Sequence, residues 1–225
     1  MLHSYMKKHN LTSLLSGIPE NEIQFYEFAK REVIINTGEP ISQIFFFVDG
    51  KVKIYKLTNE GKRLTLRFQK APVIVGELEY LHGEHAQYSV AASSVCLAIG
   101  LRFETIRKYL NDNPDFLRYL LEMVSHKFST KVHLSSMNLL YPVDVRFASY
   151  ILSITGDEEE TLFDEDREDV TLSDICEMIG TSYRHLNRVV QRFCEQGIIR
   201  KEQRTIHINN RQKLLEIAKG NIYEP

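Results

Sequence analysis

The chain of 225 residues has no tryptophan, only three cysteines and no long uninterrupted apolar run. Cys96, Cys176 and Cys194 form no CxxC pair and are too scattered for a disulfide framework, so we expect reduced thiols. No stretch approaches the ~20 apolar residues of a membrane span, and the first residues lack the apolar core of a secretory signal. These absences predict a cytoplasmic protein with no membrane partner.

An excess of positive charge is also lacking, because the formal net charge is -2. Proteins that bind nucleic acid normally carry a footprint of Lys and Arg. The local balance differs, since residues 157–169 contain nine acidic residues and one Arg, whereas residues 171–213 contain eight Lys or Arg against four Asp or Glu. The acidic segment therefore offsets the positive charge of a basic segment, and the net charge does not argue against DNA binding.

The overall composition is that of an ordinary packed protein, with 43% apolar and 26% charged residues. Single cores usually settle near ~100 to 150 residues, so the length allows two modest domains. We therefore expect two domains.

Residues 33–99 consist of short β-rich segments separated by turn residues, which predicts an all-β N-terminal part. In residues 51–57 charged and apolar residues alternate, as in a strand with one wet face and one buried face. Gly50 and Gly61 lie where hairpin turns are needed. The expected strands are VII, IFFFVDG, KVKIYKLTNEGK, RLTLRF, VIVGEL, YSVAA and VCLAIG.

From Phe103 to about Asn138 apolar residues recur at helical spacing, and some of them form one narrow stripe. Steps of four, three, four and four residues suit the seam between two helices. A helix packed on its own domain would show the same spacing, but a helix that connects two modules favours a dimer seam. We therefore predict a homodimer interface at Leu117, Leu121, Val124, Phe128 and Val132.

Tyr141-Pro142 interrupts the helical pattern and predicts a hinge, since proline disfavours helix at the residue before it. The next segment, VDVRFASYILSIT, has the pattern of an amphipathic helix. The expected fold class is α+β. Its three parts are an N-terminal sensor over 1–110, a dimerisation helix over 111–140 and a DNA-binding domain over 141–225.

The segment that follows the acidic stretch has the pattern of a helix-turn-helix. Thr171 or Ser173 can cap a first helix, Gly180 supplies the turn, and Ser182 can cap a second helix while facing a phosphate. The expected buried positions of the first helix are Leu172, Ile175, Cys176 and Ile179.

The second helix divides into a packing face and a reading face. Apolar residues fall together on one side, at Leu186, Val189, Val190 and Phe193. The opposite side carries types that suit guanine and adenine edges in the major groove, namely Arg184, Asn187, Arg188 and Gln191. Backbone contacts are expected from the flanking Tyr183, His185 and Arg192.

A charged hairpin follows this helix and predicts a wing. Gly197 ends the helix, and Ile198 begins a strand that returns through Ile206. Lys201 and Arg204 near the tip predict phosphate contacts. A polar helix face is usually only a solvated surface. Here the cap, the glycine turn, the basic face and the wing occur in order, which favours double-stranded DNA as the partner.

The chain resembles the Crp/Fnr superfamily of bacterial regulators over nearly its whole length. Gly76-Glu77-Leu78 resembles the ligand-pocket signature of that family, and Asn113-Pro114-Asp115 resembles the start of its dimer helix. Arg188 falls at the family's main base-reading arginine. The glycines of its β-roll are matched by Gly38, Gly50, Gly61 and Gly76.

Within the superfamily, APVIVGELEYL and SYRHL look most like the YeiL-type branch. The resemblance implies a cyclic-nucleotide-binding-like β-roll, a long dimerisation helix and a C-terminal winged helix-turn-helix. It also implies a homodimer on a palindromic operator and RNA polymerase as a partner. Whether the protein activates or represses stays open.

The same resemblance reveals a departure at the effector site. Members that bind cyclic AMP have an Arg-Ser pair about ten residues after the signature, where this chain has His85-Ala86-Gln87-Tyr88. A buried phosphate without its counter-ion costs several kcal/mol, so we do not expect cyclic AMP. The candidate effector pocket, for an unknown effector or none, comprises Gly76, Glu77, Leu78, Ala86 and Gln87. Glu77 stays open between a ligand contact and a structural carboxylate.

Cofactor chemistry is weakly represented. An iron-sulfur cluster is not expected, because no Cys precedes Cys96 and a cluster normally needs about four thiolates. Haem stays open, although each candidate also fits an ordinary polar role: His82, His85, His126 and His133. No metal site is predicted. Cys194 is either an oxidation switch or an inert small residue.

Two other classes remain as alternatives. An effector-binding adaptor would use the winged helix for protein contacts instead of DNA. An enzyme would need a catalytic set, and the sequence has no nucleophile-base motif, metal triad or phosphate loop.

Overall fold

The computed structural model describes residues 5–7, 11–58, 60–61, 63–83, 85–155, 170–202, 205–220 and 223. The acidic segment 157–169 therefore lies outside the described residues. The chain divides into two compact units, Met1–Ser125 and His126–Pro225. Helix α5 (Pro114–Leu140) contributes to both. Among the described residues, no helix is both long enough and apolar enough to cross a bilayer.

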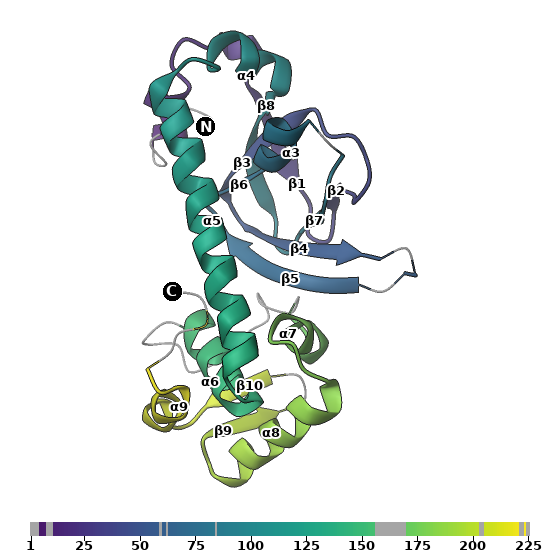
Figure 1. Ribbon diagram of the computed structural model, residues 1–225, viewed down its shortest axis with the longest axis vertical. Helices are drawn as coiled ribbons and strands as arrows, with labels where there is room; N and C mark the ends of the chain where they lie inside the picture. Colours follow the sequence, from purple (N-terminus) through teal and green to yellow (C-terminus); the bar gives the residue numbers. More distant parts are fainter. Residues whose placement is uncertain are drawn as a thin grey trace. The chain divides into compact units, whose positions relative to one another are not determined.

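The first unit is built on two four-stranded antiparallel sheets, with strand orders β1-β8-β3-β6 and β2-β7-β4-β5 (Figure 1). The expected β-roll is confirmed. Its elements are α2 (Leu11–Leu14), η1 (Glu20–Glu22), β1 (Gln24–Phe28), β2 (Val33–Ile35), β3 (Gln43–Asp49), β4 (Lys51–Leu57), β5 (Arg63–Lys70), β6 (Val73–Val75), α3 (Glu77–His82), β7 (Ser89–Ala92), β8 (Cys96–Arg102) and α4 (Phe103–Tyr109).

Strand β3 lies at the centre of this unit because it is apolar on both faces. Ile44 and Phe46 pack in one core cluster with residues of β8 and α5, whereas Phe45 and Phe47 pack in a second cluster with residues of β4 and β7. A strand buried on both sides needs a continuous apolar run and not an alternating one. This requirement explains the run IFFFV in the sequence.

Strand β4 shows the alternation predicted from the sequence only in part, because Ile54 is half-buried and Leu57 at the strand end is 42% exposed. Val52 is buried in the second core cluster, while Lys53 places its ammonium 5.2 Å from the ring centroid of Phe68 on the paired strand β5. The long hairpin of β4 and β5 is plain in Figure 1.

Three parts of the first unit differ from the sequence prediction. VIVGEL is not one strand, because β6 ends at Val75 and α3 begins at Glu77. Gly76 between them has φ 96°, and a Cβ there would lie 2.6 Å from the carbonyl oxygen of Gln43. Strand β1 was missed because its sequence QFYEF does not alternate in polarity, although its burial does: the apolar Phe25 lies on the exposed face and is 38% exposed.

The third difference concerns the region from Phe103 onward, where the predicted helical spacing is divided between two helices. Helix α4 ends at Tyr109, and α5 begins at Pro114. The Oδ1 atom of Asn113 accepts hydrogen bonds from the backbone N–H groups of Asp115 at 3.0 Å and Phe116 at 3.1 Å. This side-chain cap starts α5 at the site indicated by Asn113-Pro114-Asp115.

The second unit contains the end of α5, the helices and strands of a winged helix-turn-helix, and a closing helix. Its described elements after α5 are α6 (Val143–Ile154), α7 (Leu172–Met178), α8 (Tyr183–Glu195), β9 (Ile199–Glu202), β10 (Thr205–Ile208) and α9 (Arg211–Ala218). Helix α5 ends before Tyr141-Pro142, where an interruption of the helical pattern was predicted from the sequence. Pro142 is the N-cap residue of α6.

The amphipathic pattern predicted for α6 was wrong. Nine of its residues are buried, and they include the polar Arg146 and Ser149. The helix is covered by α8 and α9, and the backbone N–H of Tyr223 approaches the Ser149 carbonyl at 3.4 Å. Because neighbours cover several sides of α6, its polar positions are enclosed as well as its apolar ones.

Candidate nucleic-acid interface

Helix α7 begins at a capping box. Thr171 Oγ1 accepts a hydrogen bond from the backbone N–H of Asp174 at 3.2 Å, and Asp174 Oδ2 accepts from the backbone N–H of Thr171 at 3.0 Å. Of the two caps left open by the sequence, Thr171 is therefore the one used, and Ser173 is exposed. The capping carboxylate of Asp174 is itself only 1% exposed. The cap holds α7 at the point where the helix-turn-helix starts.

We expect Thr171→Ala to lower the free energy of unfolding of the second unit by about 1 kcal/mol, because a backbone N–H at the start of α7 loses its acceptor. Chemical denaturation monitored by far-ultraviolet circular dichroism measures this. Ser173→Ala is the matched control, since that hydroxyl is exposed and does not cap the helix. Equal effects of the two substitutions would contradict this role for the cap.

The turn of the helix-turn-helix forms as the sequence predicted. Gly180 has φ 65°, and the backbone N–H of Thr181 donates to the carbonyl of Cys176 at 2.9 Å, which closes the end of α7. Ser182 then caps α8, because its Oγ accepts from the backbone N–H of His185 at 3.2 Å. The side chain of Cys176 is buried at this crossing, and burial raises the pKa of its thiol to about 11.

Helix α8 separates into the two faces that the sequence indicated. The packing face is confirmed, since each of its residues is at most 3% exposed: Leu186, Val189, Val190 and Phe193. The ring of Phe193 lies 6.0 Å from that of Phe147 on α6. The opposite face projects Arg184, Arg188 and Gln191 into solvent, with Asn187 half-buried beside them. Near the start of the helix, Tyr183 is 56% exposed and His185 is also exposed.

Arg192, on the flank of this surface, forms an ion pair inside the unit. Its Nη2 lies 3.1 Å from Oδ2 of Asp144 on α6. Both side chains are partly exposed, and pairs of this kind contribute only about 0 to 1 kcal/mol. Arg192 can therefore exchange this carboxylate for a phosphate at little cost.

Strands β9 and β10 pair antiparallel and form the wing. Ile199 and Ile206 are buried against the helices, while Lys201 is exposed. The predicted contact Arg204 lies outside the described residues. Glu202 was not among the contact residues predicted for the wing. Its carboxylate lies 3.2 Å from Arg200 and 3.6 Å from His207 and so reduces the positive charge of the wing.

The residues of the candidate effector pocket lie in the first unit and are held by backbone contacts. Gly76, Glu77 and Ala86 are buried, whereas Leu78 and Gln87 are half-buried. The backbone N–H of Ala86 donates to the Glu39 carbonyl at 2.9 Å, and its carbonyl accepts from Gly38 at 2.8 Å.

A second buried carboxylate in this region was missed by the sequence analysis. Glu79 Oε1 accepts the backbone N–H of Gln87 at 3.1 Å, which is the structural role that the sequence considered for Glu77. Glu77 is only 2% exposed. The pKa of the Tyr119 hydroxyl is raised by the burial of Tyr119 and also by the negative charge of Glu77. The sequence has a glutamate at both position 77 and position 79, so the sequence alone did not show which of the two carboxylates accepts the backbone N–H of Gln87.

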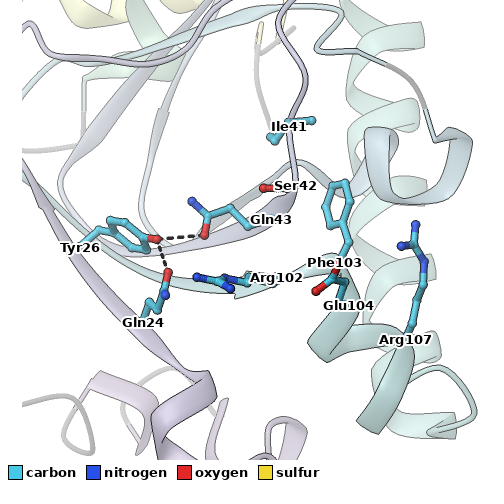
Figure 2. Close-up of a pocket in the computed structure, with 9 residues that line it drawn as sticks. All are labelled: Gln24, Tyr26, Ile41, Ser42, Gln43, Arg102, Phe103, Glu104 and Arg107. Atoms are coloured by element: carbon cyan, nitrogen blue, oxygen red, sulfur yellow. Dashed lines mark hydrogen bonds between the residues drawn. The ribbon is translucent and has the colours of Figure 1, made fainter.

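An open cleft of about 440 Å³ lies at another place in the first unit, and no residue of the candidate effector pocket lines it. Figure 2 shows Tyr26 at one end, where its hydroxyl bonds to the side-chain oxygens of Gln24 and Gln43, and Arg107 at the other. The cleft is lined by Gln24, Tyr26, Ile41, Ser42, Gln43, Arg102, Phe103, Glu104 and Arg107. Within the described ranges, no cluster of side chains could hold a metal ion.

Two of the three cysteines are buried thiols. All three are free, with Cys96 and Cys176 buried and Cys194 half-buried. Burial raises the pKa of the Cys96 thiol, which lies 3.0 Å from the Lys51 carbonyl oxygen. Both buried thiols are therefore protonated at neutral pH and poorly reactive.

A β-roll combined with a capped helix-turn-helix and a wing is the architecture of a DNA-binding transcriptional regulator. Residues 26–113 match the cyclic nucleotide-binding domain family, and residues 145–217 match the Crp-like helix-turn-helix domain family. The chain belongs to the Crp/Fnr superfamily of transcriptional regulators.

Individual relatives support this assignment. The chain is 27% identical to the regulatory protein YeiL of Escherichia coli O157:H7 over 197 residues, which cover 88% of this chain and 86% of that protein. It is 22% identical to a CRP-like cAMP-activated global transcriptional regulator of Mycobacterium tuberculosis, with 88% and 89% covered. The fold matches a CRP-family regulator of Thermus thermophilus with a TM-score of 0.72 at 18% identity, over 88% of this chain and 98% of that one.

Proposed function

We propose that this regulator acts as a homodimer that binds a palindromic operator through α8, and that a signal in the β-roll other than cyclic AMP modulates binding. The observation that carries the proposal is the outer face of α8, where arginine and amide side chains project from a helix whose opposite face is packed. Direct readout requires a rigid helix with such side chains free to enter the major groove.

The proposed DNA contacts divide by role. Arg184, Asn187, Arg188 and Gln191 read base edges, and the remaining residues contact the backbone: Ser182, Tyr183, His185, Arg192, Lys201 and Arg204. Backbone contacts fix the register of a protein on the duplex, whereas base contacts carry the sequence information. RNA polymerase is the further partner we propose, by analogy with the superfamily.

The proposed dimer seam rests on the apolar stripe of α5. Four of its residues remain highly exposed in the single chain, since Leu117, Leu121, Phe128 and Val132 are 47%, 67%, 69% and 49% exposed. Val124 between them is half-buried. A contiguous apolar stripe of this kind marks an interaction surface, and a heptad-like spacing fits a second copy of the same helix.

The effector is proposed to differ from cyclic AMP because of the stretch His85-Ala86-Gln87-Tyr88. Ala86 is 3% exposed and carries no charge, so it offers no counter-ion to a cyclic phosphate. The M. tuberculosis relative is named as cAMP-activated. This chain should respond to a different signal or to none.

Selection of bound sequences from random DNA tests the proposal. We expect an enriched palindrome whose half-sites are one helical turn apart, and binding that weakens steeply with salt, because each neutralised phosphate releases counter-ions. Repeating the selection with cell extract, and separately with cyclic AMP, tests the effector. Absence of any enriched site favours the adaptor alternative, and a large gain of affinity with cyclic AMP alone overturns the effector part of the proposal.

A further inference from the structure

The carbonyl end of α7 is held by side chains from three other segments of the second unit. Asn138 near the end of α5 donates from Nδ2 to the Met178 carbonyl at 3.1 Å. The hydroxyl of Tyr223 lies 2.6 Å from the same carbonyl oxygen and 3.0 Å from Asn138 Oδ1. Arg146 on α6 donates from Nη1 to the carbonyls of Ile179 and Gly180, the latter at 3.3 Å.

These contacts satisfy groups that a helix end otherwise leaves unpaired. The last carbonyls of a helix have no partner within the helix, and they carry the negative end of its dipole. A guanidinium and two polar side chains that converge on them therefore form strong, directional bonds. They act on residues 178–180, directly before the cap Ser182 that starts α8.

Burying these polar side chains at the end of α7 is unfavourable in free energy, which indicates that they have a specific role. Arg146 is only 8% exposed, and its Nε is buried with no hydrogen-bond partner among the described residues. Tyr223 is 2% exposed. Burying a charge with one N–H unmatched costs free energy that an apolar residue would not cost.

We propose that Asn138, Arg146 and Tyr223 are positioning residues for DNA recognition: this anchor cluster sets the orientation of α8 and couples it to the end of α5. The proposal rests on the proposed function in taking α8 as the reading helix. Asn138 belongs to the helix that carries the dimer stripe, so a shift at the end of α5 moves the amide that holds Met178. The cluster thereby gives a signal in α5 a physical route to the turn before α8.

The test compares Arg146→Met, Arg146→Lys and Tyr223→Phe in the full chain. We expect Arg146→Met to weaken binding to the selected operator about tenfold or more, since the carbonyls of Ile179 and Gly180 lose their donor. Binding to non-operator DNA should change by less than about threefold, because it depends on exposed phosphate contacts. Arg146→Lys should recover part of the loss, and Tyr223→Phe should give a smaller loss in the same direction.

Amide hydrogen exchange provides a readout independent of DNA. Exchange at Gly180 to Ser182 should accelerate in Arg146→Met and Tyr223→Phe while the amides in the middle of α8 stay protected. Arg211→Met is the matched control, because Arg211 bonds to the hydroxyl at 3.1 Å and carbonyl at 3.2 Å of Thr155, at the end of α6 and not at the turn. This control should leave operator binding and turn exchange unchanged.

Three results would overturn the proposal. One is amide hydrogen exchange at Gly180 to Ser182 that is unchanged in both Arg146→Met and Tyr223→Phe. Another is parallel loss of operator and non-operator binding with uniform loss of protection, which denotes general unfolding. The third is an equal effect of Arg211→Met on operator binding. Failure of the wild-type chain to select any operator would instead refute the proposed function, and the exchange data would still decide whether the cluster holds the turn.

Discussion

Arg188→Ala is expected to abolish discrimination between operator and non-operator DNA while the dimer stays intact. Arg188 is exposed in the middle of the outer face of α8, and its neighbours one turn away on either side are Arg184 and Arg192. A bidentate contact between arginine and guanine contributes about 1–3 kcal/mol of discrimination, and a dimer makes it once in each half-site. The affinity ratio should therefore fall by about one to four powers of ten.

Fluorescence anisotropy with the selected operator and a scrambled duplex, measured over a range of salt, checks this result. Lys201→Ala is the matched control, because Lys201 is exposed on the wing and is expected to contact phosphate. It should weaken binding to both duplexes alike and reduce the salt slope by about two, one for each subunit, whereas Arg188→Ala should leave the slope nearly unchanged. An unaltered affinity ratio in Arg188→Ala would remove Arg188 from the reading surface.

Phe128→Glu is expected to separate the dimer into monomers. Phe128 is 69% exposed in the single chain and lies within the apolar stripe of α5. Burying a phenylalanine stabilises an interface by about 1.5–3 kcal/mol, and the two-fold seam loses two of them and gains two buried charges. Because the second half-site is then no longer bound at high effective concentration, operator affinity should fall by about a hundredfold or more.

Sedimentation equilibrium measures the dimer, and circular dichroism verifies that each chain remains folded. Ser129→Glu places the same charge one residue along, on an exposed position outside the stripe, and should leave the dimer intact. Dimers that persist in Phe128→Glu and dissociate in Ser129→Glu would assign the seam to a different face of α5.

The helix-turn-helix could be predicted from the sequence because its determinants are local. The cap at Thr171, the left-handed Gly180 and the cap at Ser182 each act within a few residues of their own position. The periodicity of α8 likewise separates a buried face from an exposed one without knowledge of the neighbours.

Contacts between distant segments could not be predicted in this way. The end of α6 accepts Arg211 from 56 residues away, and Arg146 reaches the Ile179 carbonyl across 33 residues. The prediction that α6 is amphipathic was wrong for the same reason, since α8, α9 and Tyr223 cover faces that a lone helix would expose to water. Nothing in the local pattern of Arg146 indicates that it is buried.

The sequence by itself determined the β-roll, the long helix and the order of the helix-turn-helix, because alternation, helical spacing and caps are short-range properties. Only the tertiary structure decided which carboxylate of Glu77 and Glu79 accepts the backbone N–H of Gln87, that β6 ends at Val75 before Gly76, and which side chains hold the turn before α8. Those outcomes depend on groups that folding brings together from separate elements. A hydrogen bond between such groups produces no periodic pattern in the sequence.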